Sequence, residues 1–201
     1  MDDHVGMKRL FDVLSSMFAL VLLAPAMVVI SLAVAVGSKG GAFFKQIRVG
    51  KQGKPFELLK FRTMRMGSEA QGQLTVGGRD PRITGIGHFL RRTKLDELPQ
   101  LLNVFRGEMS IVGPRPEVPK YVALYTPEQR VVLQVRPGLS SLASIEYINE
   151  NEVLGRSSDP EGTYVHEVMP AKLHLDLKYV REQSLALDLR IIFGTLAKLF
   201  G

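Results

Sequence analysis

The sequence predicts an α+β protein that begins with an apolar membrane helix bent at Pro25. A small, mostly helical domain with a short β-hairpin and amphipathic surface helices is expected to follow. Three observations lead to this fold class: an uncharged apolar run over residues 13–38, two short strand-like segments after it, and helical periodicity in most of the rest. We therefore divide the chain into a membrane segment, residues 1–40, and a second domain, residues 41–201.

The membrane segment lacks any charged side chain over 26 consecutive residues. About 20 apolar residues suffice to cross the bilayer core as a helix, so a straight span is one alternative. Basic residues flank the run at both ends. The positive-inside rule, which depends on a difference in Lys and Arg between the two flanks, therefore does not assign the ends to opposite sides of the membrane. Pro25 lies near the middle, where it removes a helical hydrogen bond and kinks the helix. A helix that enters, bends at Pro25 and returns to the same face fits both facts. The basic residues are Lys8, Arg9, Lys39, Lys45, Arg48, Lys51 and Lys54.

Two strands and a turn are expected directly after the membrane segment. Residues Phe43–Gly50 and Pro55–Met64 have strand character, and the basic turn Lys51–Lys54 between them contains a glycine. This order predicts a β-hairpin. The polar, glycine-rich stretch Gly67–Arg82 predicts a long loop.

Helical patterns account for most of the remaining chain. The last predicted helix could belong to the core or lie on the membrane surface. Ser140–Gly155 is ambiguous, and Arg156–Gly162 is typical of a polar loop. In the first helix, Asp12 follows Arg9 by three residues, which is the spacing of an ion pair. The expected helices cover Gly85–Arg92, Glu117–Tyr125, Pro127–Val135, Pro170–Glu182 and Leu185–Leu199.

Two adjacent acids, Asp96 and Glu97, lie at the start of a further helical pattern. Pro99 suits the first turn of that helix because its missing N–H is not needed there. The unpaired N–H groups and the macrodipole of a helix start favour an ionised carboxylate. An ionised Asp beside a second acid suits a nucleophile that attacks phosphorus or a divalent-cation site. The alternative is that both acids are simply good helix-start residues. The periodic apolar positions are Leu98, Leu101, Leu102 and Phe105.

Five basic residues flank turns or helix ends and are candidate phosphate ligands. Arginine suits phosphate because its planar guanidinium makes bidentate, charge-assisted hydrogen bonds. Arg115 is the strongest candidate, since two prolines fix the backbone of the motif Gly113–Pro116 on both sides of it. Lys60 and Arg62 could instead be exposed side chains of an edge strand, and Arg91 could instead pair with Glu97. The five are Lys60, Arg62, Arg91, Arg115 and Arg136.

Composition narrows the classes of partner. The 201 residues include no cysteine and only four histidines, which excludes disulfides and thiolate metal sites and disfavours a histidine zinc site. The net charge of +6 favours anionic partners. No tryptophan is present and no basic block alternates with aromatic residues, so a nucleic-acid platform is a poor fit. Phosphorylated small molecules and membrane lipid headgroups are the expected partners.

Six motifs occur in a characteristic order: Lys8–Asp12, Phe43–Gly50, Lys60–Met64, Leu95–Gln100, Gly113–Pro116 and Val135–Leu139. Through them the chain resembles, over nearly its whole length, the bacterial sugar transferases, a family of small monotopic polyprenyl-phosphate phosphoglycosyl transferases. Any one motif is weak, whereas the set in this order is specific. One departure is Ala24 before Pro25, where the family commonly has serine.

The resemblance implies a re-entrant membrane helix and a catalytic domain on the cytoplasmic face of the inner membrane. It implies transfer of a phosphosugar from a nucleotide sugar, with a uridine diphosphate sugar expected, to a polyprenyl phosphate such as undecaprenyl phosphate. The nucleoside monophosphate would leave, and the product would begin the synthesis of an exopolysaccharide or another glycoconjugate. Asp96 would form a covalent phosphosugar–aspartate. Glu97 would bind Mg²⁺ or accept a proton, and Asp96 would share the metal. Asp176 and Tyr179 also match family positions, although an amphipathic helix predicts a solvated face for them.

Two other functions stay open. A glycosyltransferase that moves the sugar without its phosphate would release the nucleoside diphosphate. A non-catalytic membrane scaffold would show no metal-dependent turnover and would tolerate substitution of Asp96. The sequence also leaves open which sugar is carried, which glycan is made, and whether the chain forms a homo-oligomer.

Overall fold

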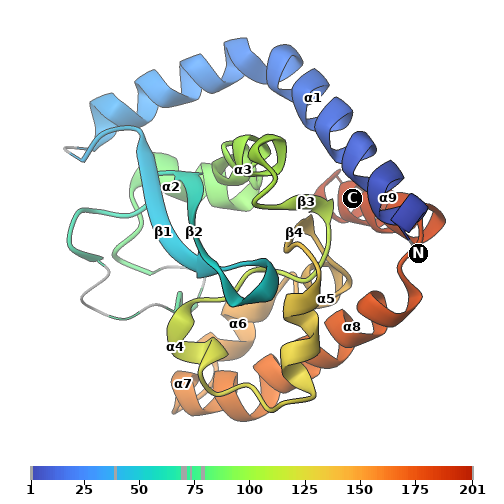
Figure 1. The fold of residues 1–201 in the computed structure, drawn as a ribbon. Helices are drawn as coiled ribbons and strands as arrows, with labels where there is room; N and C mark the ends of the chain where they lie inside the picture. The colour runs from blue at the N-terminus through green and yellow to red at the C-terminus, as the bar shows by residue number, and fades with distance from the viewer. Residues whose placement is uncertain (1, 39, 69–71, 73, 78–79, 201) are drawn as a thin grey trace.

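The computed structural model describes residues 2–38, 40–68, 72, 74–77 and 80–200. It combines helices with two small sheets (Figure 1), which confirms the expected mixture of helix and strand. Helix α1 (Asp2–Gly37) arches over one side of the other elements, and helix α8 (Met169–Glu182) lies on the opposite side.

Helix α1 continues through Pro25 as one helix. In the described part of the chain it is the one helix whose length and composition, over Gly6–Gly37, would let it cross a membrane. Its re-entrant placement stays a prediction, and Lys39, one of the flanking basic residues, lies outside the described residues. The large apolar side chains that α1 exposes are Met7, Leu10, Leu14, Met17, Phe18, Val21, Leu22, Val28, Val29, Leu32 and Val36.

Polar contacts attach the first turns of α1 to the rest of the protein. Asp12 is buried and accepts hydrogen bonds from Ser110 Oγ at 3.0 Å and from the Ile111 backbone N–H at 2.9 Å. The Arg9 guanidinium donates to the carbonyl oxygens of Val104 and Phe105, at 2.7 and 2.8 Å, near the C-terminus of helix α3 (Gln100–Arg106). The predicted ion pair between Arg9 and Asp12 is therefore replaced by contacts with other elements.

The predicted β-hairpin is confirmed. Strands β1 (Phe43–Val49) and β2 (Pro55–Phe61) pair antiparallel, with Phe43 opposite Phe61, and a 3₁₀ turn (Lys51–Gly53) connects them. Phe61 packs with Val34 of α1 and Leu90 of helix α2 (Gly85–Arg92) in a small apolar cluster. This cluster places the hairpin against the C-terminal part of α1 (Figure 1).

A second sheet was not expected from the sequence. Strands β3 (Ser110–Val112) and β4 (Gly138–Ser140) pair in parallel. Gly138 lies so close to Gly113 that a Cβ atom at position 138 would fall 2.1 Å from the Gly113 nitrogen. The close approach requires glycine there and fixes the turn Gly113–Pro116 that follows β3.

Some of the predicted helices have nearly the same bounds in the structure, and others are shorter. The predicted helices at 85–92, 170–182 and 185–199 are confirmed, whereas those at 117–125 and 127–135 are shorter than predicted, a four-residue α-helix and a six-residue 3₁₀ helix. The segment 156–162, expected as a polar loop, begins a short helix at Pro160, because the Asp159 side chain accepts a hydrogen bond from the Gly162 N–H and caps it. The helices not yet named are α4 (Pro119–Val122), the 3₁₀ helix Gln129–Gln134, α5 (Leu142–Glu146), α6 (Glu150–Gly155), α7 (Pro160–Thr163), the π-helix Tyr164–Val168 and α9 (Leu185–Phe200).

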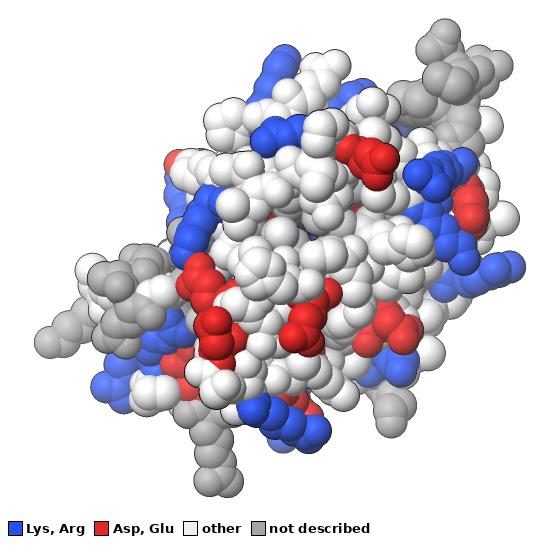
Figure 2. All heavy atoms as spheres, turned by 90° about the horizontal axis from the view of Figure 1, so that it is seen from below, with Lys and Arg blue, Asp and Glu red and all other residues white. Residues whose placement is uncertain are grey.

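The side of the molecule away from α1 differs in character from the apolar surface of α1. Figure 2 shows that side, with Lys and Arg interspersed with Asp and Glu among uncharged residues. Charges of both signs are typical of a surface that faces water. The two sides thus differ as expected for a protein that rests on a membrane through α1.

Candidate active site

The acidic pair lies in a turn of its own. Asp96 and Glu97 belong to a 3₁₀ turn (Leu95–Glu97) that directly precedes α3, and Pro99 is the residue before the first turn of α3. Lys94 adopts a left-handed conformation, with φ of 57°, and separates this turn from α2. The pair therefore stands just before the helix rather than inside its first turn.

Most of the predicted site residues line one cavity of about 760 Å³. Its walls come from the hairpin, the acidic turn, the Gly113–Pro116 turn, α5 and α8. Arg136 is not among the lining residues; its Nε donates to the Gly107 carbonyl oxygen at 2.9 Å, at the C-terminus of α3. The predicted residues that line the cavity are Lys60, Arg62, Arg91, Asp96, Glu97 and Arg115.

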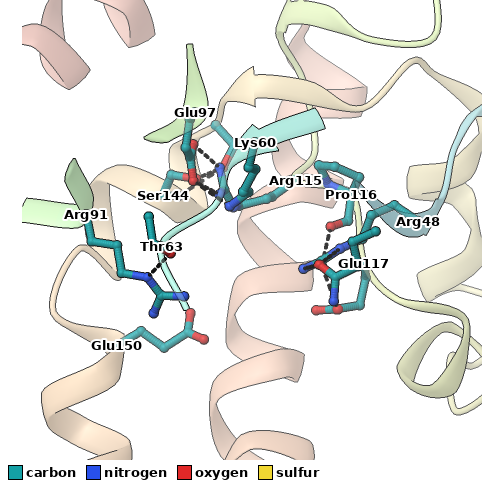
Figure 3. Close-up of polar contacts among 12 residues, drawn as sticks. Arg48, Lys60, Thr63, Arg91, Glu97, Arg115, Pro116, Glu117, Ser144 and Glu150 are labelled. Atoms are coloured by element: carbon teal, nitrogen blue, oxygen red, sulfur yellow. Dashed lines mark hydrogen bonds and ion pairs between the residues drawn. The ribbon is translucent and has the colours of Figure 1, made fainter. Parts of the chain in front are cut away.

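Glu97 is held by two cations (Figure 3). Lys60 Nζ lies 2.9 Å from Glu97 Oε1, and Arg115 Nη1 donates to Glu97 Oε2 at 3.2 Å. The second terminal nitrogen of Arg115 also pairs with Glu97 Oε1. Burial alone would raise the pKa of Glu97, but Arg115 and Lys60 together hold that pKa well below its usual range. Glu97 is therefore ionised.

Asp96 has the opposite environment. Its side chain is buried, and its Oδ1 atom has no hydrogen-bond partner among the described residues. Burial raises the pKa of Asp96, and Lys60 opposes the shift. Neighbouring acids whose pKa values are pushed apart are typical of sites where the two carboxyl groups have different tasks. The geometry leaves Asp96 as the carboxylate with a free oxygen.

Arg91 and Arg62 lie further out. Arg91 Nε donates to Thr63 Oγ1 at 2.8 Å, and its Nη1 donates to Thr75 Oγ1 at 3.0 Å, so Arg91 does not take up the alternative pairing with Glu97. Arg62 donates to the carbonyl oxygens of Gly41 and Phe43, at 3.2 and 2.9 Å, at an exposed edge of the hairpin. Arg91 keeps a guanidinium within the cavity wall, whereas Arg62 ties the start of β1 to the end of β2.

Asp176, which matches a family position, does not lie on the solvated face that an amphipathic helix predicts for it. It is buried on α8, lines the cavity, and has an Oδ1 atom without a partner among the described residues. Burial raises the pKa of Asp176 to about 7, although Lys172 opposes the shift. The signal was present in the sequence, because Asp176 shares a helical face with Met169, Leu173 and Tyr179, all of which are buried.

A second buried network supports the other side of the Arg115 loop. Arg48 donates to the Pro116 carbonyl oxygen at 2.9 Å and to Glu117 Oε1 at 3.1 Å (Figure 3), and the Tyr164 hydroxyl pairs with Glu117. The sequence counted Arg48 only among the charges that flank the membrane segment. No local pattern signals this role, because Arg48 and Glu117 are far apart in the chain.

The residues fit a divalent cation that arrives with a phosphate. Mg²⁺ is commonly bound through one or two carboxylates plus substrate phosphates, and it retains water ligands. Asp96 offers one buried carboxylate oxygen without a partner among the described residues, and Glu97 is the adjacent carboxylate, which would share its oxygens between the cation and its present partners Lys60 and Arg115. In the described ranges, no group of three or more histidine, cysteine or acidic residues forms a complete protein cage for a metal.

Comparisons with known proteins identify the family of the chain. The family model for bacterial sugar transferases matches residues 3–201. A UDP-glucose:undecaprenyl-phosphate glucose-1-phosphate transferase from Klebsiella pneumoniae is 38% identical over 201 residues, and one from Caulobacter vibrioides is 36% identical over 195 residues. An exopolysaccharide production protein, PSS, from Rhizobium leguminosarum bv. phaseoli is 40% identical over 196 residues.

The extent of the matches differs between these relatives. The aligned region includes 96% of this chain against the Klebsiella and Caulobacter proteins and 94% against the Rhizobium protein. It spans 40% of the Klebsiella relative, 69% of the Caulobacter relative and 92% of the Rhizobium relative. The family model covers nearly the whole chain, so the protein belongs to the bacterial sugar transferase family.

Proposed function

We propose that this protein transfers a phosphosugar from a uridine diphosphate sugar to a polyprenyl phosphate and releases uridine monophosphate. The observation that carries the proposal is the pairing of two unlike acids in one cavity. Asp96 has a buried oxygen without a partner among the described residues, and Glu97 beside it is ionised and held by Lys60 and Arg115. The names of the relatives supply the classes of donor and acceptor.

The electrostatic problem is that one anion must attack another. A diphosphate repels a carboxylate until its charge is offset by cations placed around it. Lys60, Arg91 and Arg115 place three cations on the cavity wall. A Mg²⁺ ion held by Asp96 and Glu97 would supply further charge neutralisation when bound. Arg136 has no part in this proposal, because its guanidinium holds the end of α3.

The proposed reaction has two steps that balance. A carboxylate oxygen of Asp96 attacks the sugar-bearing phosphorus, the bond to the nucleoside monophosphate breaks, and the nucleotide leaves with the bonding electrons. An oxygen of the polyprenyl phosphate then attacks the same phosphorus, and the bond to Asp96 breaks. Asp96 is restored, and the product is a polyprenyl-diphosphate sugar.

The lipid acceptor also has a route that the structure supports. The cavity lining includes Ala19 and Leu23 of α1 and Leu196 and Leu199 of α9, in addition to the charged residues. These apolar side chains suit a prenyl chain, while the basic residues suit its phosphate. We propose that the cavity opens toward the inner membrane on its cytoplasmic face, where the acceptor phosphate lies at headgroup depth.

The test is the identity of the released nucleotide. Purified protein is incubated with undecaprenyl phosphate, Mg²⁺ and a panel of uridine diphosphate sugars, and the nucleotides are separated chromatographically, with Asp96→Asn as the control. We expect uridine monophosphate in proportion to lipid product. Release of uridine diphosphate would identify a glycosyltransferase instead. No turnover with any member of the panel, by a folded protein, would support the non-catalytic scaffold.

A further inference from the structure

Asp188 joins three elements although it is completely buried. It lies in the first turn of α9, and its Oδ2 pairs with Lys8 Nζ of α1 at 2.6 Å. The Tyr179 hydroxyl of α8 donates to Asp188 Oδ1 at 2.7 Å and also lies 3.1 Å from the Val112 carbonyl oxygen. Lys8 is itself mostly buried, with 14% of its side chain exposed, so its charge is directed at Asp188 rather than at lipid headgroups.

A second buried contact leads from α1 to the same strand. Asp12, one turn after Lys8, accepts hydrogen bonds from Ser110 and Ile111. Strand β3 (Ser110–Val112) therefore receives support from the start of α1 at its first two residues and from Tyr179 at its last. Strand β3 has only three residues, so these two attachments help to fix its position.

Strand β3 leads directly into the turn that carries Arg115. The Gly113 N–H donates to the Ser140 carbonyl oxygen at 3.0 Å, and the Gly138 N–H donates to the Pro114 carbonyl oxygen at 2.8 Å. Pro114 and Pro116 restrict the backbone on either side of Arg115. A displacement of β3 is therefore transmitted to Arg115, which pairs with Glu97.

We propose that Lys8, Asp188 and Tyr179 are positioning residues that hold β3, and through it Arg115, in place against Glu97. We call these three residues the strut. Through the strut, the position of the membrane helix α1 affects the orientation of Arg115, the proposed phosphate ligand. The inference rests on the proposed function. Breaking a buried ion pair leaves an uncompensated charge, so removing one partner disturbs the strut more than removing both.

The test is a double-mutant cycle on kcat between the strut and Arg115. Tyr179→Phe removes only the hydroxyl and keeps the ring in the core. We expect Tyr179→Phe to lower kcat by about tenfold in the wild-type background and by less than about twofold in the Arg115→Lys background. Lys120→Met, which breaks the exposed Lys120–Glu161 pair, is the matched control and should leave kcat unchanged in both. Equal factors in the two backgrounds would show that Tyr179 supports the fold alone and would overturn the proposal.

A second measurement does not depend on turnover. Hydrogen exchange of the Ile111 and Gly113 amides should become at least about tenfold faster in Asp188→Asn and in Tyr179→Phe, and should recover partly in the double variant Lys8→Met with Asp188→Asn relative to Asp188→Asn alone. Unchanged protection of these amides would also overturn the proposal. If the wild-type protein turned over no nucleotide sugar, the proposed function would fail, whereas the exchange result would still decide the structural coupling.

Discussion

Arg115 and Glu97 form a two-point ion pair in the wall of the cavity, with Nη1 of the guanidinium 3.2 Å from Oε2 of the carboxylate and the other terminal nitrogen on Oε1. Lys60 completes the neutralisation of Glu97 at 2.9 Å. A bidentate pair fixes direction as well as charge. Arg115 is thereby held in one orientation, and the neighbouring Asp96 keeps an Oδ1 atom without a hydrogen-bond partner among the described residues.

Arg115→Lys tests this orientation. A lysine keeps the charge but loses the planar fork, so it cannot contact both Glu97 oxygens in the same way. We expect turnover to fall by about tenfold or more, which corresponds to about 1.4 kcal/mol in the activation barrier. Steady-state kinetics with the accepted nucleotide sugar measure the loss. The control is Arg106→Lys, at an exposed position on α3, which should leave the rate within about twofold. A near wild-type rate for Arg115→Lys would assign the pair a purely structural role.

The topology of α1 is tested with cysteine labelling, because the native chain has no cysteine. A side chain at Gly6 meets nothing within 4 Å, and Lys54 is exposed in the hairpin turn, so Gly6→Cys and Lys54→Cys are well tolerated sites. If α1 is re-entrant, a membrane-impermeant thiol reagent should label neither position in intact cells and both after permeabilisation. Labelling of position 6 but not position 54 in intact cells would show that α1 spans the membrane.

Asp176 gives the folding stability a dependence on pH. Its pKa is raised to about 7 by burial, above the value of about 3.9 expected for the unfolded chain. The folded state thus disfavours the charged form, and wild type loses free energy of unfolding as the pH rises from about 4 to about 7. Relative to wild type, Asp176→Asn should gain roughly 2–3 kcal/mol between pH 5 and pH 8. Denaturant unfolding in detergent micelles at both pH values measures this difference. Glu128→Gln, at an exposed position, serves as the control, and a pH-independent difference for Asp176→Asn would contradict the expectation.

The sequence predicted those helices and strands whose formation depends mainly on neighbouring residues in the chain. The hairpin follows from two apolar segments around a glycine turn, and α2, α8 and α9 follow from long helical periodicity. The acidic pair and Arg115 were identified because their immediate neighbours restrict them. The parallel pairing of β3 with β4 could not be predicted, since it joins three-residue strands that are distant in the chain and have little pattern of their own.

The contacts of charged side chains could not be predicted either where the partner is distant in the chain. Arg136 and Arg115 both stand next to a proline, and only the tertiary structure directs Arg136 to the Gly107 carbonyl oxygen and Arg115 to Glu97. Lys8 was counted as a membrane-flanking charge, although it is paired with Asp188 from the other end of the chain. The burial of Asp176 could have been predicted, because its helical spacing from Leu173 places it on the buried face.

The covalent intermediate is the prediction on which the mechanism depends most. If Asp96 is the nucleophile, the first half-reaction needs no lipid acceptor. With the accepted nucleotide sugar and Mg²⁺ alone, about one equivalent of uridine monophosphate should appear as a burst. Intact-mass measurement should show the gain of one phosphosugar, and peptide mapping should locate it on the peptide that contains Asp96.

Two variants separate the tasks of the two acids. Asp96→Asn should abolish both the burst and turnover, because an amide is a poor nucleophile and an equally poor metal ligand. Glu97→Gln should also be severe, but through a different cause: it removes the charge that Lys60 and Arg115 surround, and it leaves these two buried cations without their partner. Restoration of part of the Glu97→Gln burst by raised Mg²⁺ would indicate that Glu97 contributes to metal binding. Nucleotide release that strictly requires the lipid, with no trapped adduct, would instead indicate direct transfer between the two substrates. In that case Asp96 would act by binding the metal, since its free oxygen could still serve as a ligand.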